Sequence, residues 1–320
     1  MTFSCATQSL IITKVRERPP KMSPLKFLRV LWLFTESDFA TFVIPDTAFG
    51  FFGALAGSAM SSSNTHDLYS CLRRLPLVLM SNWLNLLIFD LANQFAPESI
   101  TEDTINKPWR PLPAGLVTPR QTQYLLLASV PVVLVSNYIL GAGYEAAVLV
   151  ALTWMYNGLG GGNDHFVVRN LIICVAFGYY NEGSLLVALG QPNAPLTPAA
   201  WIWVVMISAV IFTTMQAQDM KDQAGDRIRG RSTVPLVLGD GVARWTIAIP
   251  VAVWSFVCPA FWGLGPLGYL APIGLGLGVV FRILWLRSAE ADRRTWQMWT
   301  AWTACLYALP AINRYCHLCI

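Results

Sequence analysis

The chain has 320 residues, of which 55% are hydrophobic and only 12% are charged, and its mean hydropathy is +0.49. This composition excludes a soluble domain, because the surface of such a domain must carry enough charge to remain in water. The net charge of +4 needs no nucleic-acid partner, since the basic residues follow a membrane topology. We therefore expect an all-α integral membrane protein.

Apolar runs long enough to cross the hydrocarbon layer as helices recur along the chain. Residues 1–37 come before the first run and are predicted to form a cytosolic N-terminal arm. This arm is not a cleaved signal peptide, because its apolar stretch is short and its charges follow that stretch. Residues 38–320 are predicted to form one domain with nine transmembrane helices: 38–60, 75–95, 121–140, 144–160, 166–189, 198–218, 242–262, 266–286 and 295–313.

The Lys and Arg residues are distributed unequally between the two sides of this predicted bundle. About nineteen of the 22 fall on the side of the N-terminus, leaving Arg73, Arg74 and Arg314 opposite. We expect the N-terminus and both long polar loops to be cytosolic, and the chain to reside in the endoplasmic reticulum membrane.

The loop after the sixth predicted helix carries three aspartates, Asp219, Asp222 and Asp226. Their spacing of i, i+3 and i+7 predicts one face of a helix with three carboxylates. Carboxylates this close repel one another unless a cation lies among them, and hard oxygen ligands suit Mg²⁺. Basic residues close by are candidates for binding a diphosphate: Lys221, Arg227 and Arg231.

The loop after the second predicted helix repeats this pattern less regularly. Pro97 is suited to open a short helix, on which Glu98 and Glu102 share a face and Asp103 is adjacent. These acids are a second candidate Mg²⁺ site. Lys107 and Arg110 follow them and are further candidates for diphosphate binding.

Two acidic clusters in equivalent places on one membrane face, with Lys and Arg between them, favour a site for a diphosphate. A groove leading from it into an aromatic-rich bundle suits a long hydrocarbon chain. The predicted substrate is therefore a diphosphate that carries a long hydrocarbon chain, with Mg²⁺ as cofactor and the lipid bilayer as surroundings. No protein partner is predicted.

These motifs resemble the two aspartate-rich motifs of the UbiA superfamily of intramembrane prenyltransferases. The resemblance rests on Asn93-Gln94, Glu102-Asp103 and the run from Asn106 to Pro111, followed by Asp219-x-x-Asp222-x-x-x-Asp226. It implies a single UbiA-like bundle in which Asn93 joins the acids as a metal ligand and Arg169 binds the diphosphate. The implied catalytic residues are Asn93, Glu98, Asp103, Asp219, Asp222 and Asp226.

The first motif departs from the usual family form, in which an aspartate follows the asparagine, because Gln94 stands there. This departure is similar to the fungal UbiA-type terpene cyclases, the group that includes bergamotene and cyathane synthases. It favours a cyclase that ionises a polyprenyl diphosphate, either farnesyl or geranylgeranyl diphosphate, and cyclises the resulting carbocation. The alternative is a prenyltransferase that moves the prenyl group to an aromatic or other small acceptor.

Polar residues near or within the predicted helices are candidates for the substrate cavity or for accepting the final proton: Asp90, Asn157, Tyr179, Tyr180, Asn181 and Glu182. A carboxylate at the end of a spanning helix, such as Asp90, costs free energy without a partner and so indicates function.

A secondary transporter is a further hypothesis, but it predicts charges near the middle of the helices. Here the acids cluster at one face.

Overall fold

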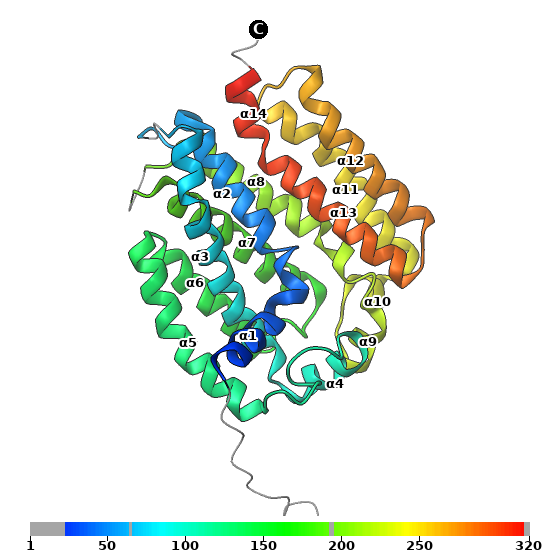
Figure 1. Cartoon of the computed structure of the whole chain (residues 1–320). Helices are drawn as coiled ribbons and strands as arrows, with labels where there is room; N and C mark the ends of the chain where they lie inside the picture. Colours follow the sequence, from blue (N-terminus) through cyan, green and yellow to red (C-terminus); the bar gives the residue numbers. More distant parts are fainter. Residues whose placement is uncertain (1–22, 64–65, 192–194, 317–320) are drawn as a thin grey trace, which may run out of the picture.

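The computed structural model describes residues 23–63, 66–191 and 195–316, and this part of the chain is a bundle of helices (Figure 1). The helices in chain order are α1 (Pro24–Phe39), α2 (Val43–Leu55), η1 (Gly57–Ala59), α3 (Leu68–Gln94), α4 (Pro97–Asn106), α5 (Pro119–Leu140), α6 (Gly143–Thr153), the π-helix η2 (Trp154–Gly158), α7 (Phe166–Leu189), α8 (Pro198–Thr214), η3 (Met215–Gln218), α9 (Gln223–Arg229), α10 (Val234–Leu238), α11 (Asp240–Phe261), α12 (Pro266–Trp285), α13 (Ala289–Tyr307) and α14 (Leu309–Cys316).

Six of the nine predicted spans are helices that are long and apolar enough to cross a membrane. They are α3, α5, α7, α8 with η3, α11 and α12. The other three predicted segments are each interrupted. The segment 38–60 breaks between α1 and α2, 144–160 changes from α6 to the π-helix η2, and 295–313 breaks between α13 and α14.

The predicted boundary of the N-terminal arm at residue 37 falls inside α1. Residues 1–22 of the arm lie outside the described residues. Helix α1 packs against α3, where Val30 and Phe34 are buried with Leu87 and Leu91. The bundle therefore begins at α1, before the first predicted span.

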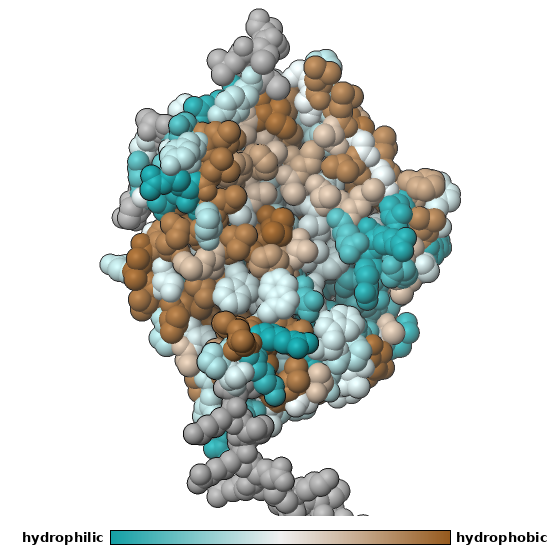
Figure 2. Space-filling view, viewed as in Figure 1, coloured by the Kyte–Doolittle hydropathy of each residue, from teal (hydrophilic) through white to brown (hydrophobic). Residues whose placement is uncertain are grey.

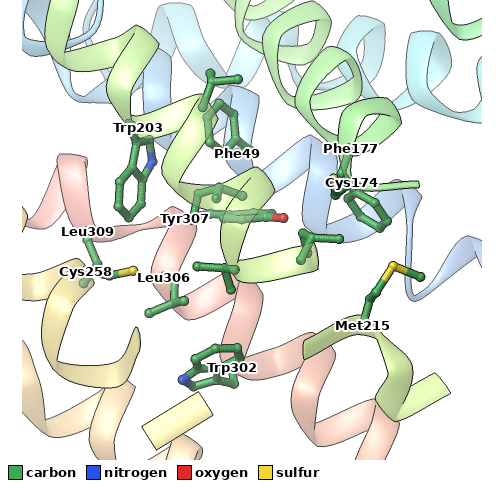
Figure 3. Packing of buried hydrophobic residues seen from close by; sticks show 14 of the residues in the cluster. Phe49, Cys174, Phe177, Trp203, Met215, Cys258, Trp302, Leu306, Tyr307 and Leu309 are labelled. Carbon is green, nitrogen blue, oxygen red and sulfur yellow. The ribbon is translucent and has the colours of Figure 1, made fainter. Parts of the chain in front are cut away.

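Hydrophobic side chains form both the centre and much of the outer surface. The main core contains the fully buried Trp203, Trp302 and Tyr307 (Figure 3). Large apolar residues such as Leu127 and Ile139 of α5 are exposed, and Figure 2 shows hydrophobic surface over much of the bundle. An apolar exterior is expected where lipid replaces water as the solvent.

Helices α2 and α7 run parallel and in close contact through the middle of the bundle. Phe42 stacks on Phe177 at one point, with ring centroids 5.3 Å apart. Further along, a Cβ atom on Gly50 would lie 2.4 Å from the backbone oxygen of Ser184. Only glycine permits this approach, which holds the aromatic residues of both helices beside the cavity described below.

We expect Gly50→Ala to lower the thermal stability of the detergent-solubilised protein. The added methyl group forces α2 away from the α7 backbone, and overpacking of this kind costs about 1–3 kcal/mol. Gly274→Ala in α12 is the control, because a Cβ atom there meets no atom within 4 Å. The melting temperatures of both variants test this, and an unchanged value for Gly50→Ala would contradict the close packing.

Candidate active site

One cavity lies at the end of the bundle that carries the short helices α4 and α9 (Figure 1). It encloses ≈ 1090 Å³, including the space at its open entrance. Its wall has a charged part, which we call the mouth, and an apolar inner part, which we call the chamber. The charged and amide residues are Asp38, Asp90, Asn93, Glu102, Asn106, Lys107, Arg110, Arg169, Gln218, Asp219, Lys221, Asp222, Asp226 and Arg231.

The three aspartates of the second loop line this cavity, but the prediction that they share one helix is wrong. Asp219 follows the 3-10 helix η3, Asp222 is the N-cap of α9, and only Asp226 lies within α9. A turn between the two short helices replaces the continuous helix. All three carboxylates nevertheless line the same cavity.

Each of these aspartates has a cationic partner. Arg169 of α7 donates two hydrogen bonds to Asp219, of 3.0 and 2.9 Å, and both side chains are buried. Arg231 donates to Asp226 at 3.0 Å, while Lys221 contacts Asp222 and also lies 4.5 Å from the ring centroid of Trp296.

Glu102 joins the two loops. It accepts hydrogen bonds from Arg229 at 2.8 Å and from Arg231 at 3.1 Å, so α4 is bound to α9 and to the segment after it. Because Arg231 also pairs with Asp226, one guanidinium connects an acid of each loop. The motifs that are far apart in sequence are thus in direct contact.

Arg110 is the centre of a second group of charges. It donates to both oxygens of Asp103 at 3.1 Å and to Asp38 at 2.6 Å, and Asp90 lies 4.0 Å away. Burial raises the pKa of Asp38, but Lys107 and Arg110 outweigh burial and hold this pKa at about 2. The sequence analysis missed Asp38, which reaches the cavity through the packing of α1 on α3.

The structure brings together most of the predicted site residues but not all of them. Glu98 and Arg227 are exposed and do not line the cavity, so the predicted clustering needs correction at both. Asp103 is buried behind Arg110. Among the polar candidates, Tyr180 lines the cavity, whereas Tyr179, Asn157 and Asn181 do not.

The inner part of the cavity is apolar and aromatic. Its wall includes the stacked pair Phe42 and Phe177, and Phe89 packs on Tyr156 with ring centroids 5.4 Å apart. The π-helix η2 presents Tyr156, and a Cβ atom on Gly162 would meet the Tyr156 ring at 2.4 Å. The remaining apolar lining is Leu86, Leu149, Leu152, Ile172, Ile173 and Ala176.

The oxygen ligands suit Mg²⁺ in kind, although in the described residues no three His, Cys, Asp or Glu side chains are grouped closely enough to hold a metal alone. Oδ2 of Asp226 is buried without a hydrogen-bond partner. Burial and the neighbouring Asp219 raise the pKa of Asp226 to about 6, against the effect of Arg231. Mg²⁺ is typically bound through one or two carboxylates plus substrate phosphate, so these residues fit it.

The described helices form a membrane bundle around a cavity, and an acid- and arginine-lined mouth leads from the surface to its apolar chamber. These features define an integral-membrane enzyme. Residues 50–302 match the model of the UbiA prenyltransferase family, and the chain therefore belongs to this family.

Curated relatives include terpene synthases. Fumagillin beta-trans-bergamotene synthase of Aspergillus fumigatus is 34% identical over 247 residues, which cover 75% of this chain and 76% of the relative. Somaliensene A/B synthase of Streptomyces somaliensis is 30% identical over 307 residues, covering 88% of this chain and 93% of the relative. A polyprenyl transferase of Hericium erinaceus is also similar, with 29% identity over 85% of this chain and 90% of the relative.

Solved structures share the fold. A UbiA homolog from Archaeoglobus fulgidus bound to GPP and Mg²⁺ has a TM-score of 0.60 at 12% identity, covering 91% of this chain and 100% of that chain. The similarity in fold thus extends well beyond recognisable sequence identity.

We expect Arg110→Gln to destabilise the protein, because it leaves Asp38 and Asp103 without their guanidinium partner. Removing one partner of a buried ion pair costs about 3–5 kcal/mol. Arg227→Gln is the matched control, since Arg227 is exposed and is in no ion pair among the described residues. Thermal unfolding of both variants in detergent tests the assignment, and equal melting temperatures would show that Arg110 does not have this central role.

Proposed function

We propose that this protein is a Mg²⁺-dependent terpene cyclase that ionises farnesyl or geranylgeranyl diphosphate and cyclises the carbocation to a sesqui- or diterpene in secondary metabolism. The observation that carries the proposal is the two-part cavity, in which a charged mouth adjoins an apolar aromatic chamber. This division matches a substrate with a diphosphate at one end and a hydrocarbon chain at the other.

The mouth binds and holds the diphosphate through its cationic side chains. Arg169, Lys221 and Arg231 line the cavity and already contact oxygen atoms, those of the aspartates. Guanidinium groups form bidentate pairs with phosphate as they do with carboxylate. The arginines therefore need only small movements to exchange a carboxylate oxygen for one of the diphosphate.

The charge balance of the mouth supports a role for divalent cations. Its six carboxylates are Asp38, Asp90, Glu102, Asp219, Asp222 and Asp226, and its five cationic side chains are Lys107, Arg110, Arg169, Lys221 and Arg231. The formal sum is one negative charge before a diphosphate enters. Bound Mg²⁺ would supply the positive charge that neutralises the leaving group, and Asp219, Asp222 and Asp226 are the residues that would hold it.

The apolar chamber keeps water from the hydrocarbon chain and surrounds it with aromatic rings. Phe42, Phe89 and Phe177 line it, and Tyr156 and Tyr180 are its aromatic residues with a hydroxyl group. Aromatic faces attract cations, by about 2 kcal/mol or more when both are desolvated. The chamber would therefore favour internal attack by a double bond of the substrate over capture by water.

Cyclisation is favoured over transfer to an acceptor because the inner wall offers few polar groups. Within the described residues, Thr153, Tyr156 and Tyr180 are its polar side chains. Two of the relatives carry the name of terpene synthases, which supports the same conclusion. The similarity to a polyprenyl transferase supports the second candidate, a UbiA-type transferase acting on an aromatic or other small acceptor.

We also propose that the cavity mouth faces the cytosol, in the endoplasmic reticulum membrane. Arg74 and Arg314 bond to the carbonyl oxygens of Val187 and Leu55, at the ends of α7 and α2 far from the mouth. The small number of basic residues at that end supports this orientation.

Asp219→Ala and Asp226→Ala are each expected to lower diphosphate release from the substrate by about 10²-fold or more, because a cation ligand beside the leaving group is lost. EDTA should stop the wild-type reaction and added Mg²⁺ should restore it. Glu290→Ala is the control, since this exposed acid of α13 pairs only with Arg294 among the described residues. Near-wild-type release by either aspartate variant would refute the metal assignment.

A purified sample given farnesyl or geranylgeranyl diphosphate with Mg²⁺ and no acceptor tests the reaction itself. A cyclised hydrocarbon or alcohol, identified by gas chromatography and mass spectrometry, is the expected product. If only unreacted or hydrolysed chain is recovered, and an added aromatic acceptor becomes prenylated, the transferase is the correct function.

A further inference from the structure

Of the three acids of the first loop that the sequence suggests as metal ligands, Glu102 lines the cavity, where it is bonded to Arg229 and Arg231, whereas Glu98 and Asp103 do not line it. Glu98 is exposed in the first turn of α4, outside the cavity. Asp103 is absent from the wall of the cavity, and both of its oxygens accept hydrogen bonds from Arg110. Gln94, which stands where the family usually has an aspartate, is buried and donates from Nε2 to the carbonyl oxygen of Phe34 at 2.8 Å. This amide joins α3 to α1 and is directed away from the cavity.

Three other oxygen-bearing side chains line the cavity on this side. Asp90 and Asn93 lie one turn apart on α3, and Asp38 joins them from the end of α1. One guanidinium nitrogen, Nη2 of Arg110, lies 2.6 Å from Asp38 and 4.0 Å from Asp90. The two carboxylates are therefore close neighbours, in a position where a shared cation relieves their repulsion.

The charges around Asp90 are incompletely balanced. Among the described residues, Asp38, Asp90 and Asp103 form ion pairs with two cationic side chains, Lys107 and Arg110. Lys221 is near enough to help lower the pKa of Asp38, but it is paired with Asp222. Asp90 is 1% exposed, and its Oδ2 is buried without any hydrogen-bond partner. A buried carboxylate needs a partner, and the more so at the end of a membrane-spanning helix. Arg110 bonds to Asp38 and Asp103 more closely than to Asp90, so a bound cation would supply the partner that Oδ2 of Asp90 lacks.

The amide of Asn93 is oriented by its neighbours. Nδ2 of Asn157 donates to the carbonyl oxygen of Thr153 at 3.1 Å, which leaves Oδ1 of Asn157 as an acceptor. Nδ2 of Asn93 donates to this oxygen at 3.0 Å. Oδ1 of Asn93 then has no hydrogen-bond donor among the described residues and is available to the cavity. Its oxygen is the atom type that Mg²⁺ prefers.

We propose that Asp90 and Asn93 of α3, together with Asp38 of α1, bind a divalent cation opposite the Asp219–Asp226 loop, and that Glu98 is not a ligand. This proposal rests on the Mg²⁺ dependence proposed above. It assigns the α3 side of the site to residues outside the acidic run of the first loop. Asn157 is a positioning residue, which acts by directing the oxygen of Asn93 into the cavity.

Mn²⁺ binding measured by electron paramagnetic resonance tests this assignment without turnover. The purified protein in detergent is titrated with Mn²⁺ in the presence of inorganic diphosphate. Asp90→Asn and Asp38→Asn are expected to weaken Mn²⁺ binding by about tenfold or more. Glu98→Gln should bind as the wild type does, and so should Glu290→Gln, the control for removal of a remote acid. Weakened binding by Glu98→Gln together with wild-type binding by Asp90→Asn overturns the proposal.

Substitution of Asn157 is a second, independent test, because it leaves all three proposed ligands in place. Asn157→Ala is expected to weaken Mn²⁺ binding by about 10- to 100-fold, as loss of a group that orients a metal ligand does. Asn157→Asp should retain tight binding, because its carboxylate still accepts the hydrogen bond from Nδ2 of Asn93. Asn157→Leu separates this role from packing, because leucine has a similar branched shape but accepts no hydrogen bond. The orienting role predicts that Asn157→Leu binds Mn²⁺ as weakly as Asn157→Ala, whereas near-wild-type binding by Asn157→Leu, or equal effects of Asn157→Ala and Asn157→Asp, would contradict it.

Thermal unfolding and size-exclusion profiles of the same samples identify any variant that has lost its fold. The outcomes also separate this proposal from the function on which it rests. Absence of Mn²⁺ binding by the wild type rejects the Mg²⁺ dependence itself. Binding that is sensitive to Asp226→Asn but insensitive to Asp38→Asn, Asp90→Asn and Asn157→Ala rejects only the α3 site.

Discussion

Pairing of buried carboxylates with arginine and lysine is the constraint on which the mouth of this protein depends. Acids at the edge of a lipid bilayer are costly unless a positive group lies beside them. Arg169, Arg231 and Arg110 each meet this need for acids from different helices. The same contacts therefore fix the arrangement of α1, α4, α7 and α9 and set the electrostatic potential in the cavity.

Composition and apolar runs predicted the helical membrane class because lipid imposes a length and an apolar surface that are visible in sequence. Interruptions were harder to predict. The segment 38–60 is apolar almost throughout, yet a turn at residues 40–42 divides it and brings Asp38 to the cavity. Linear hydropathy contains no signal for such a turn, since it is decided by how α1 packs on α3.

The loops show the same limit at the level of single side chains. Glu98 and Glu102 have the spacing of neighbours on a helix, but Arg229 and Arg231 reach only Glu102, and Glu98 remains exposed. The spacing of Asp219, Asp222 and Asp226 suggested that these residues lie near one another, and all three line the cavity, although a turn and not a continuous helix places them there. Spacing thus indicated a shared location better than it indicated the ion-pair partners of each residue.

The double pairing of Arg231 with Glu102 and Asp226 affects how the two loops are held before and after a ligand binds. A guanidinium that holds an acid from each loop keeps the two loops together before any ligand arrives. If a phosphate group bonded to this guanidinium, as the proposed function requires, it would replace one of the acids and the loops would be joined through the ligand. Release of the ligand would then restore the direct ion pairs, so the closed arrangement of the two loops needs no bound ligand.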